Sequence, residues 1–156
     1  MTDSPPASSA SDLKDHLGYW LRALSNRVSH SFQLKVESHG VTVAEWVILR
    51  ALLADESLSA SSLADTLGLT RGAVSKLIDR LSAKRLLTAR AVRQDRRYQH
   101  LRLTPAGRAL VPILAGLADV NDHKFFGHLS AQARSELKAQ LEDLCRRHDV
   151  HQSPVD

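Results

Sequence analysis

Positive charge is concentrated in one part of this chain. Residues 71–108 contain eleven lysines and arginines but only two carboxylates, Asp79 and Asp95, an excess of nine positive charges. The whole chain of 156 residues has a formal net charge of only +4, so the remainder is net acidic. A basic segment of this kind is the electrostatic footprint of a polyanion partner such as DNA. Taken one at a time, these cations could equally be ordinary solvated side chains.

The spacing of apolar residues predicts the helices that precede this segment. From Leu13 to Phe32, apolar residues recur at three- and four-residue steps, which predicts a long amphipathic helix that ends before Gly40. Thr42 and Glu45 have the spacing of a capping box and open a second helix. That second helix is apolar on most of its surface and therefore belongs in the core.

Two shorter helices follow, separated by a tight turn. Ser59 is predicted to cap the third helix, which ends at Gly68, and Thr70 to cap the fourth. The turn at residues 67–70 is short and contains glycine, which is typical of a helix-turn-helix. The fourth helix has one apolar stripe for the core, formed by Val74, Leu77, Ile78 and Leu81.

After Arg85 the pattern changes from helical to alternating. Residues 87–92 and 98–103 are predicted to pair as a β-hairpin, and the polar residues 93–97 form its cationic tip. A hairpin directly after a helix-turn-helix forms a wing beside the second helix of that motif.

Two further helices complete the predicted fold. Thr104 and Pro105 mark the start of a long helix, and Ser130 caps the last one. We therefore predict a mainly α fold with a small β-hairpin wing, in which a winged helix-turn-helix joins a helical dimerisation region formed by the N- and C-terminal helices. The expected divisions are a disordered arm (1–11), the dimerisation region (12–38 with 105–148), the DNA-binding region (42–104) and a tail (149–156).

The fourth helix is the predicted reader of DNA, because a major groove admits an α-helix and its base edges distinguish the four base pairs. The side chains nearest its N-terminus usually reach the bases, so Arg71, Ser75 and Lys76 are the base-edge candidates. Gly72 would let the backbone come close to the DNA. The full predicted contact set on this helix is Arg71, Gly72, Ser75, Lys76 and Arg80.

The hairpin tip supplies a second set of predicted contacts. Arg96 and Arg97 are placed to bind phosphates or to enter a narrow minor groove, where the negative potential is enhanced. Asp95 would be repelled by DNA, so we expect it to pair with Arg97 or Arg80 and to orient the wing.

At these residues the chain resembles the MarR family of bacterial regulators. The resemblance is carried by residues 63–110, above all by Asp95-Arg96-Arg97, which matches the family's D-x-R wing, and by residues 101–107, which match its L-x-L-T-x-x-G helix entry. It implies a homodimer in which residues 13–38, 105–126 and 131–148 intertwine. It also implies that Arg97 enters the minor groove with Asp95 as its supporting partner.

Dimerisation has a physical argument of its own. The terminal helices carry more leucine than one small core can cover, and an uncovered apolar stripe is an aggregation liability. A two-fold dimer predicts a palindromic operator with half-sites about one helical turn apart.

Many members of the resembled family release DNA when a small aromatic acid binds between the dimerisation helices and the winged region. Aromatic rings and one arginine could form such a pocket here, because rings stack on an aromatic ligand and a guanidinium pairs with its carboxylate. The alternative is that the two tryptophans are core residues and that the arginine forms a structural ion pair. The candidate ligand-binding residues are His16, Tyr19, Trp20, Trp46 and Arg50.

Other classes of function have less support. The chain has no nucleophile elbow, phosphate loop, dinucleotide-binding glycine motif or zinc-protease motif, so we expect neither an enzyme nor a cofactor. Cys145, alone and late in a helix, is expected to be an inert small hydrophobe. No metal site is expected either, because His123 and His128 are off the i, i+4 spacing and the better-spaced His148 and His151 lie in the C-terminal tail, which is expected to fray. With no apolar run long enough to span a bilayer and no signal pattern, a cytoplasmic protein is expected. A non-specific architectural DNA-binding protein remains the alternative.

Overall fold

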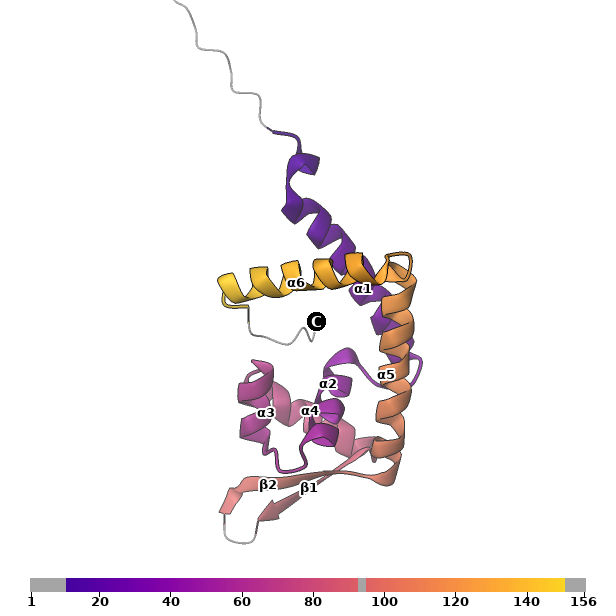
Figure 1. Cartoon of the computed structure of the whole chain (residues 1–156). Helices are drawn as coiled ribbons and strands as arrows, with labels where there is room; N and C mark the ends of the chain where they lie inside the picture. The colour runs from indigo at the N-terminus through magenta and orange to yellow at the C-terminus, as the bar shows by residue number, and fades with distance from the viewer. Residues whose placement is uncertain (1–10, 93–94, 151–156) are drawn as a thin grey trace, which may run out of the picture.

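The computed structural model describes the backbone of residues 11–92 and 95–150 and the side chains of residues 11–90 and 101–150. Within these residues the chain is mainly helical, with one antiparallel two-stranded hairpin (Figure 1). The predicted fold class is confirmed. The elements in chain order are η1 (Leu13–Asp15), α1 (Leu17–Glu37), α2 (Val43–Ala54), α3 (Ala60–Leu67), α4 (Arg71–Ala83), β1 (Leu87–Val92), β2 (Asp95–Leu103), α5 (Pro105–Phe126) and α6 (Ala131–Arg147).

The helix starts lie where the sequence predicted them, with one exception. The side chains of the predicted caps each accept a hydrogen bond from the backbone N–H three residues later, and Thr42 and Glu45 form the complete capping box. The exception is α1, which was predicted to begin at Leu13 but begins at Leu17. His16 is extended (φ −88°, ψ 125°) and separates α1 from the short 3₁₀ turn that Asp12 caps.

The connection between α2 and α3 is a tight polar turn. The hydroxyl and the backbone N–H of Ser57 both donate to Asp55 Oδ1, at 2.6 and 2.8 Å. These hydrogen bonds hold the pKa of Asp55 below its usual value, because they stabilise the carboxylate over the acid. The turn ends α2 at Ala54 and leads into the cap of α3.

The hairpin is longer than predicted. Leu87 pairs with Leu103 and Ala91 with Gln99, but the register shifts at the next pair, so that Val92 lies opposite Asp95. Strand β2 begins at Asp95, so the expectation that residues 95–97 belong to the tip was wrong. The other two residues of the predicted tip, 93–94, lie outside the described residues.

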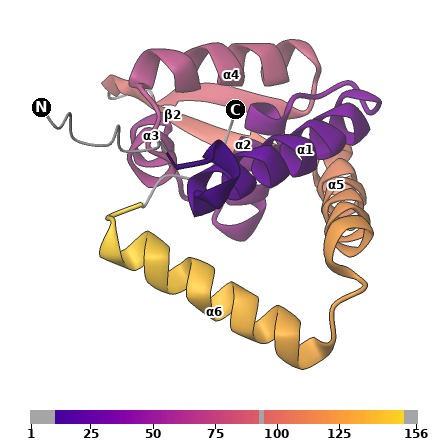
Figure 2. The same cartoon turned by 90° about the horizontal axis from the view of Figure 1, so that it is seen from above.

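The core lies between the helix-turn-helix, the base of the hairpin and the start of α5. All four residues of the predicted apolar stripe on α4 are buried there, together with residues of α2, α3 and both strands. A smaller cluster joins Val36, Val41 and Leu114 and links α1 to α5, which run side by side (Figure 1). In Figure 2, α6 stands away from the helix-turn-helix, and it contributes no buried residue. None of the helices in the described part of the chain is long and apolar enough to cross a membrane.

Candidate nucleic-acid interface

Helix α4 has one face in the core and the opposite face in solvent. Thr70 caps its N-terminus through a hydrogen bond from Ala73 N to the Thr70 hydroxyl oxygen (3.2 Å). Gly68 ends α3 in the left-handed conformation (φ 65°), which glycine adopts without a steric penalty, and this makes the tight turn possible. The predicted DNA-contacting residues of α4 are all exposed: Arg71, Gly72, Ser75, Lys76 and Arg80.

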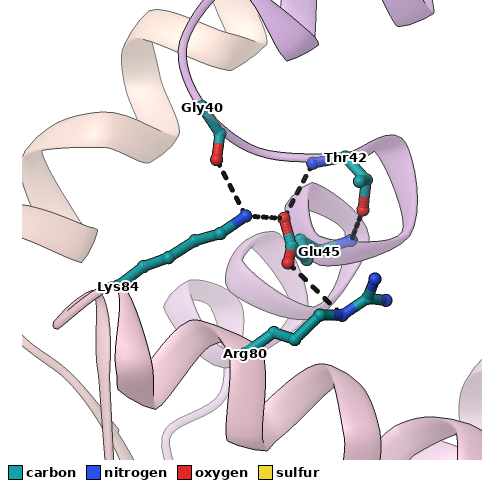
Figure 3. Close-up of polar contacts among 5 residues, drawn as sticks. All are labelled: Gly40, Thr42, Glu45, Arg80 and Lys84. Atoms are coloured by element: carbon teal, nitrogen blue, oxygen red, sulfur yellow. Dashed lines mark hydrogen bonds and ion pairs between the residues drawn. The ribbon is translucent and has the colours of Figure 1, made fainter.

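A buried carboxylate holds the far end of α4 against the start of α2 (Figure 3). Glu45 is 0% exposed. Its Oε2 accepts a hydrogen bond from Thr42 N (2.8 Å) and another from Lys84 Nζ (2.7 Å). Its Oε1 lies 3.7 Å from Arg80 Nε. Lys84 Nζ also donates to the backbone carbonyl of Gly40 (2.8 Å).

The sequence indicated a capping box for Glu45 and no specific partner for Lys84. The sequence suggested Arg97 or Arg80 as the partner of Asp95, whose side chain lies outside the described residues. Within the described side chains, the carboxylate that pairs with Arg80 is that of Glu45. The sequence contained one signal for this contact: Arg80 and Lys84 are four residues apart and therefore point to the same side of α4 and its C-cap. That spacing does not reveal which carboxylate they face.

The wing is fixed at its base by backbone contacts. Arg85 adopts a left-handed conformation (φ 58°) that turns the chain from α4 into β1. Its carbonyl accepts a hydrogen bond from the Thr104 hydroxyl (2.8 Å), and the carbonyl of Leu86 accepts one from Thr104 N (3.1 Å). The base of the hairpin and the start of α5 therefore hold each other in place.

The predicted wing contacts are only partly described. The backbone places Asp95, Arg96 and Arg97 on β2, but their side chains lie outside the described residues. Nearer the base of the hairpin, Arg90 and Arg102 are exposed. The described part of the wing therefore adds two cations to those of α4.

The candidate ligand-binding residues form two separate groups. At the start of α1, Trp20 Nε1 donates to Lys14 O (2.8 Å), and its ring packs edge-on against Tyr19 at 5.2 Å between centroids. His16 lies in the same group, within 3.1 Å of the Ser11 hydroxyl. Trp20 therefore closes the η1 turn.

The second group lies near the other end of α1. The ring of Trp46 packs edge-on against Phe32 at 5.0 Å, and the guanidinium of Arg50 lies 5.8 Å from the centre of the Trp46 ring. Trp20 and Phe32 are twelve residues apart on one helix, which corresponds to about 18 Å. A single chain therefore does not bring the two groups together.

A groove between α1 and α5 lies beside the second group. Asn121, which is buried, donates from Nδ2 to Val28 O (3.2 Å) and accepts from Lys35 Nζ (3.2 Å). Phe32 is shared between this groove and the Trp46 group. No cluster of metal-ligating side chains occurs among the described residues. The residues that line the groove are Val28, Ser29, Phe32, Ala118, Asp119, Asn121 and Asp122.

The terminal helices expose apolar side chains on a large scale. In α1 only Val36 is buried. A second groove, at the junction of α5 and α6, includes Phe126 and Leu129 among its lining residues. The large apolar residues that α1, α5 and α6 leave exposed are Leu17, Trp20, Leu21, Leu24, Leu34, Ile113, Val120, Leu137, Leu141 and Leu144.

Helices α3 and α4 form a pair joined by a glycine turn, α4 has a cationic outer face, and a hairpin follows α4 in the chain. These features define a winged helix-turn-helix protein. Residues 39–97 match the model of the MarR family. This match covers the helix-turn-helix and the first part of the wing, and it overlaps the part of the chain that resembles the same family by sequence.

One curated relative and several solved structures are similar to this chain. The HTH-type transcriptional repressor MdtR of Bacillus subtilis is 31% identical over 99 residues, which is 64% of this chain and 64% of MdtR, less than two thirds of its length. The structure of the S. aureus MepR–DNA complex has a TM-score of 0.75 at 25% identity and covers 85% of this chain and 98% of MepR. Bordetella bronchiseptica BpsR, whose structure concerns regulation of DNA binding by 6-hydroxynicotinic acid, has a TM-score of 0.72 at 29% identity, with 82% and 97% covered. Mycobacterium tuberculosis MarR family protein Rv2887, in complex with salicylic acid, has a TM-score of 0.63 at 26% identity, with 83% and 96% covered.

Proposed function

We propose that this protein is a DNA-binding transcription regulator of the cytoplasm, a repressor that binds a palindromic operator as a homodimer and leaves it when a small aromatic acid binds. The observation that carries the proposal is the exposed cationic face of α4, opposite a fully apolar buried face. A structural helix of the core has no need of such a face, whereas a helix that enters a major groove does. The match of residues 39–97 to the MarR family model supports the same function.

Within the recognition helix α4, the N-terminal half is proposed to read bases. Arg71, Ser75 and Lys76 project from the exposed side of its first turns, where recognition helices usually reach base edges. Apart from its chain neighbours and the backbone of its own helix, nothing lies within 4 Å of the position that a Cβ on Gly72 would occupy, so the surface beside it is open. Arg80, further along, is proposed to contact the phosphate backbone, and the wing residues Arg96 and Arg97 to bind the flanking groove with Asp95 as their support.

The homodimer is proposed to form through α1, α5 and α6. Helix α6 buries none of its residues within one chain, although Leu137, Leu141 and Leu144 lie on it at helical spacing. Burying apolar surface is worth about 25 cal/mol per Å². A second copy of the chain offers the same unpaired leucines, so a two-fold interface would cover both surfaces at once.

The effector is proposed to be a small aromatic carboxylate that binds near Trp46 and Arg50. Trp46 Nε1 is buried and has no hydrogen-bond partner among the described residues. Its N–H is therefore available to donate a hydrogen bond to a bound ligand. Arg50 is exposed beside the same ring and would supply the positive charge. Two structures with similar folds, those of BpsR and Rv2887, concern 6-hydroxynicotinic acid and salicylic acid, and both ligands are aromatic acids.

Selection of bound sequences from random DNA tests the proposal. A regulator is expected to enrich one short palindrome, and footprinting should show protection of two half-sites about one helical turn apart. Enrichment of no common sequence would instead support the architectural alternative. Addition of salicylate to the complex with the selected operator is then expected to release the DNA.

A further inference from the structure

The α1–α2 connection is tied to the end of α4 by one lysine side chain. Lys84 is the C-cap residue that directly follows α4. Its ammonium group donates both to the carbonyl of Gly40, in the connection, and to the carboxylate of Glu45, in the first turn of α2 (Figure 3). These two contacts join residues 44 and 39 positions apart in the sequence.

The carboxylate in this arrangement depends on its cations. Glu45 is fully buried, and its Oε1 has no hydrogen-bond partner within the described part of the chain. A buried carboxylate is costly unless it is paired. Lys84 at 2.7 Å is the close partner and Arg80 at 3.7 Å the looser one. Moving α4 away from the α1–α2 connection would break the ion pair between Lys84 and Glu45. The cost of leaving this carboxylate unpaired therefore opposes such a movement.

The two ends of this link have different tasks in the proposed regulator. Helix α1 precedes Gly40 and carries part of the apolar face proposed for the dimer, whereas α4 carries the residues proposed to read DNA. In a two-fold dimer the direction of α4 relative to α1 sets the distance between the two recognition helices. A palindrome with fixed half-site spacing demands one such distance.

We propose that Lys84 and Glu45 form an interhelix clamp that fixes the orientation of α4 against the α1–α2 connection and so sets the spacing of the two recognition helices. This inference rests on the proposed function. Lys84 is a positioning residue in it and does not need to touch DNA. The clamp therefore affects the affinity for an operator with two half-sites, which both recognition helices must contact together. It does not affect the affinity for a single half-site.

The test compares Lys84→Met with wild type on two duplexes, the selected palindrome and the same DNA with one half-site scrambled. Lys84→Met is expected to lose at least tenfold in affinity for the palindrome and to stay within twofold of wild type on the single half-site. A one-base-pair insertion between half-sites should weaken wild-type binding strongly and binding by Lys84→Met much less. Lys84→Arg, which keeps a cationic donor, is expected to restore palindrome binding.

A second variant guards against simple misfolding. Glu45→Gln/Lys84→Met removes both charges together and leaves no buried carboxylate without its lysine, and it should show the same difference between the two duplexes. Unchanged palindrome affinity, or an equal loss on both duplexes, in variants that melt cooperatively would overturn the clamp. A wild-type protein that selects no palindrome overturns the proposed function and the clamp with it.

Discussion

Gly107 packs directly against the backbone carbonyl of Leu86, so closely that a Cβ at Gly107 would overlap the carbonyl oxygen. This contact joins the first turn of α5 to the residue that precedes β1. The same carbonyl accepts the hydrogen bond from Thr104 N. Space for a side chain is therefore absent where the wing meets α5.

Gly107→Ala is expected to destabilise the fold by about 1–3 kcal/mol, the usual range for an added methyl group in a packed site. The obstruction is backbone and not a flexible side chain, so relief requires movement of α5 or of the hairpin. Urea unfolding followed by circular dichroism measures the loss. A variant as stable as wild type would show that the junction has room to adjust.

Gly72→Ala is the matched control for this stability change. It makes the same substitution in a helix, at a position where nothing but its chain neighbours and the backbone of its own helix lies within 4 Å of the new Cβ. Alanine is favoured over glycine in a helix by about 0.8–1.0 kcal/mol, so this variant should be at least as stable as wild type. If both glycine variants lost stability equally, packing at Leu86 would not be the cause.

The same Gly72→Ala variant separates DNA binding from stability. A methyl group on the exposed side of the first turn of α4 should hold the helix away from the groove and weaken operator binding. The slope of log affinity against log salt should stay unchanged, because no cation is lost. Fluorescence anisotropy at several salt concentrations measures both quantities. Wild-type affinity in this variant would mean that the backbone at Gly72 does not approach the DNA.

Arg97→Ala tests the proposed wing contact. Loss of one cation from the DNA interface is expected to weaken operator binding and to reduce the salt slope by about one. Arg146→Ala is the control with the same change in net charge, because Arg146 pairs with Asp143 at the end of α6, away from α4. Equal effects of the two variants on the salt slope would assign the change to net charge and remove the wing from the interface.

Leu141→Glu tests the dimer. Leu141 is 40% exposed on α6, where a second copy of the chain is proposed to cover it. A buried, unpaired carboxylate is costly, so sedimentation should show a shift from dimer to monomer. Leu53→Glu is the control, since Leu53 is 38% exposed but lies on α2, outside the proposed interface. Dimers of equal strength in both variants would contradict the assigned surface.

Local signals predicted most of the fold, because helix caps and apolar spacing act within a few residues. The capping box of Thr42 and Glu45 and the buried stripe on α4 are of this kind. The start of β2 was missed because a register shift depends on the partner strand. The contact between Lys84 and Glu45 joins residues 39 positions apart, and no spacing rule encodes such a pair. The ligand residues were grouped by chemical type, and the length of α1 places them apart.

Tryptophan fluorescence can test the proposed effector site, because the two tryptophans lie in different places. Trp20→Phe leaves Trp46 as the only reporter. In that background salicylate is expected to change the emission, since the ligand would lie against the ring that Arg50 flanks. A hydrogen bond to a charged group contributes about 1.5–3 kcal/mol, so Arg50→Ala should weaken salicylate binding tenfold or more.

The matched control for that experiment is Arg22→Ala, which removes an exposed arginine from α1 and lies outside the Trp46 group. It should leave the salicylate affinity at the wild-type value, because a charge distant from the ligand is screened by solvent and salt. Equal losses of salicylate affinity in the two arginine variants would show that Arg50 contributes only through its net charge and does not contact the ligand. An emission change that occurs only when Trp20 is retained would place the ligand at the start of α1, where Tyr19 and His16 are the remaining candidates.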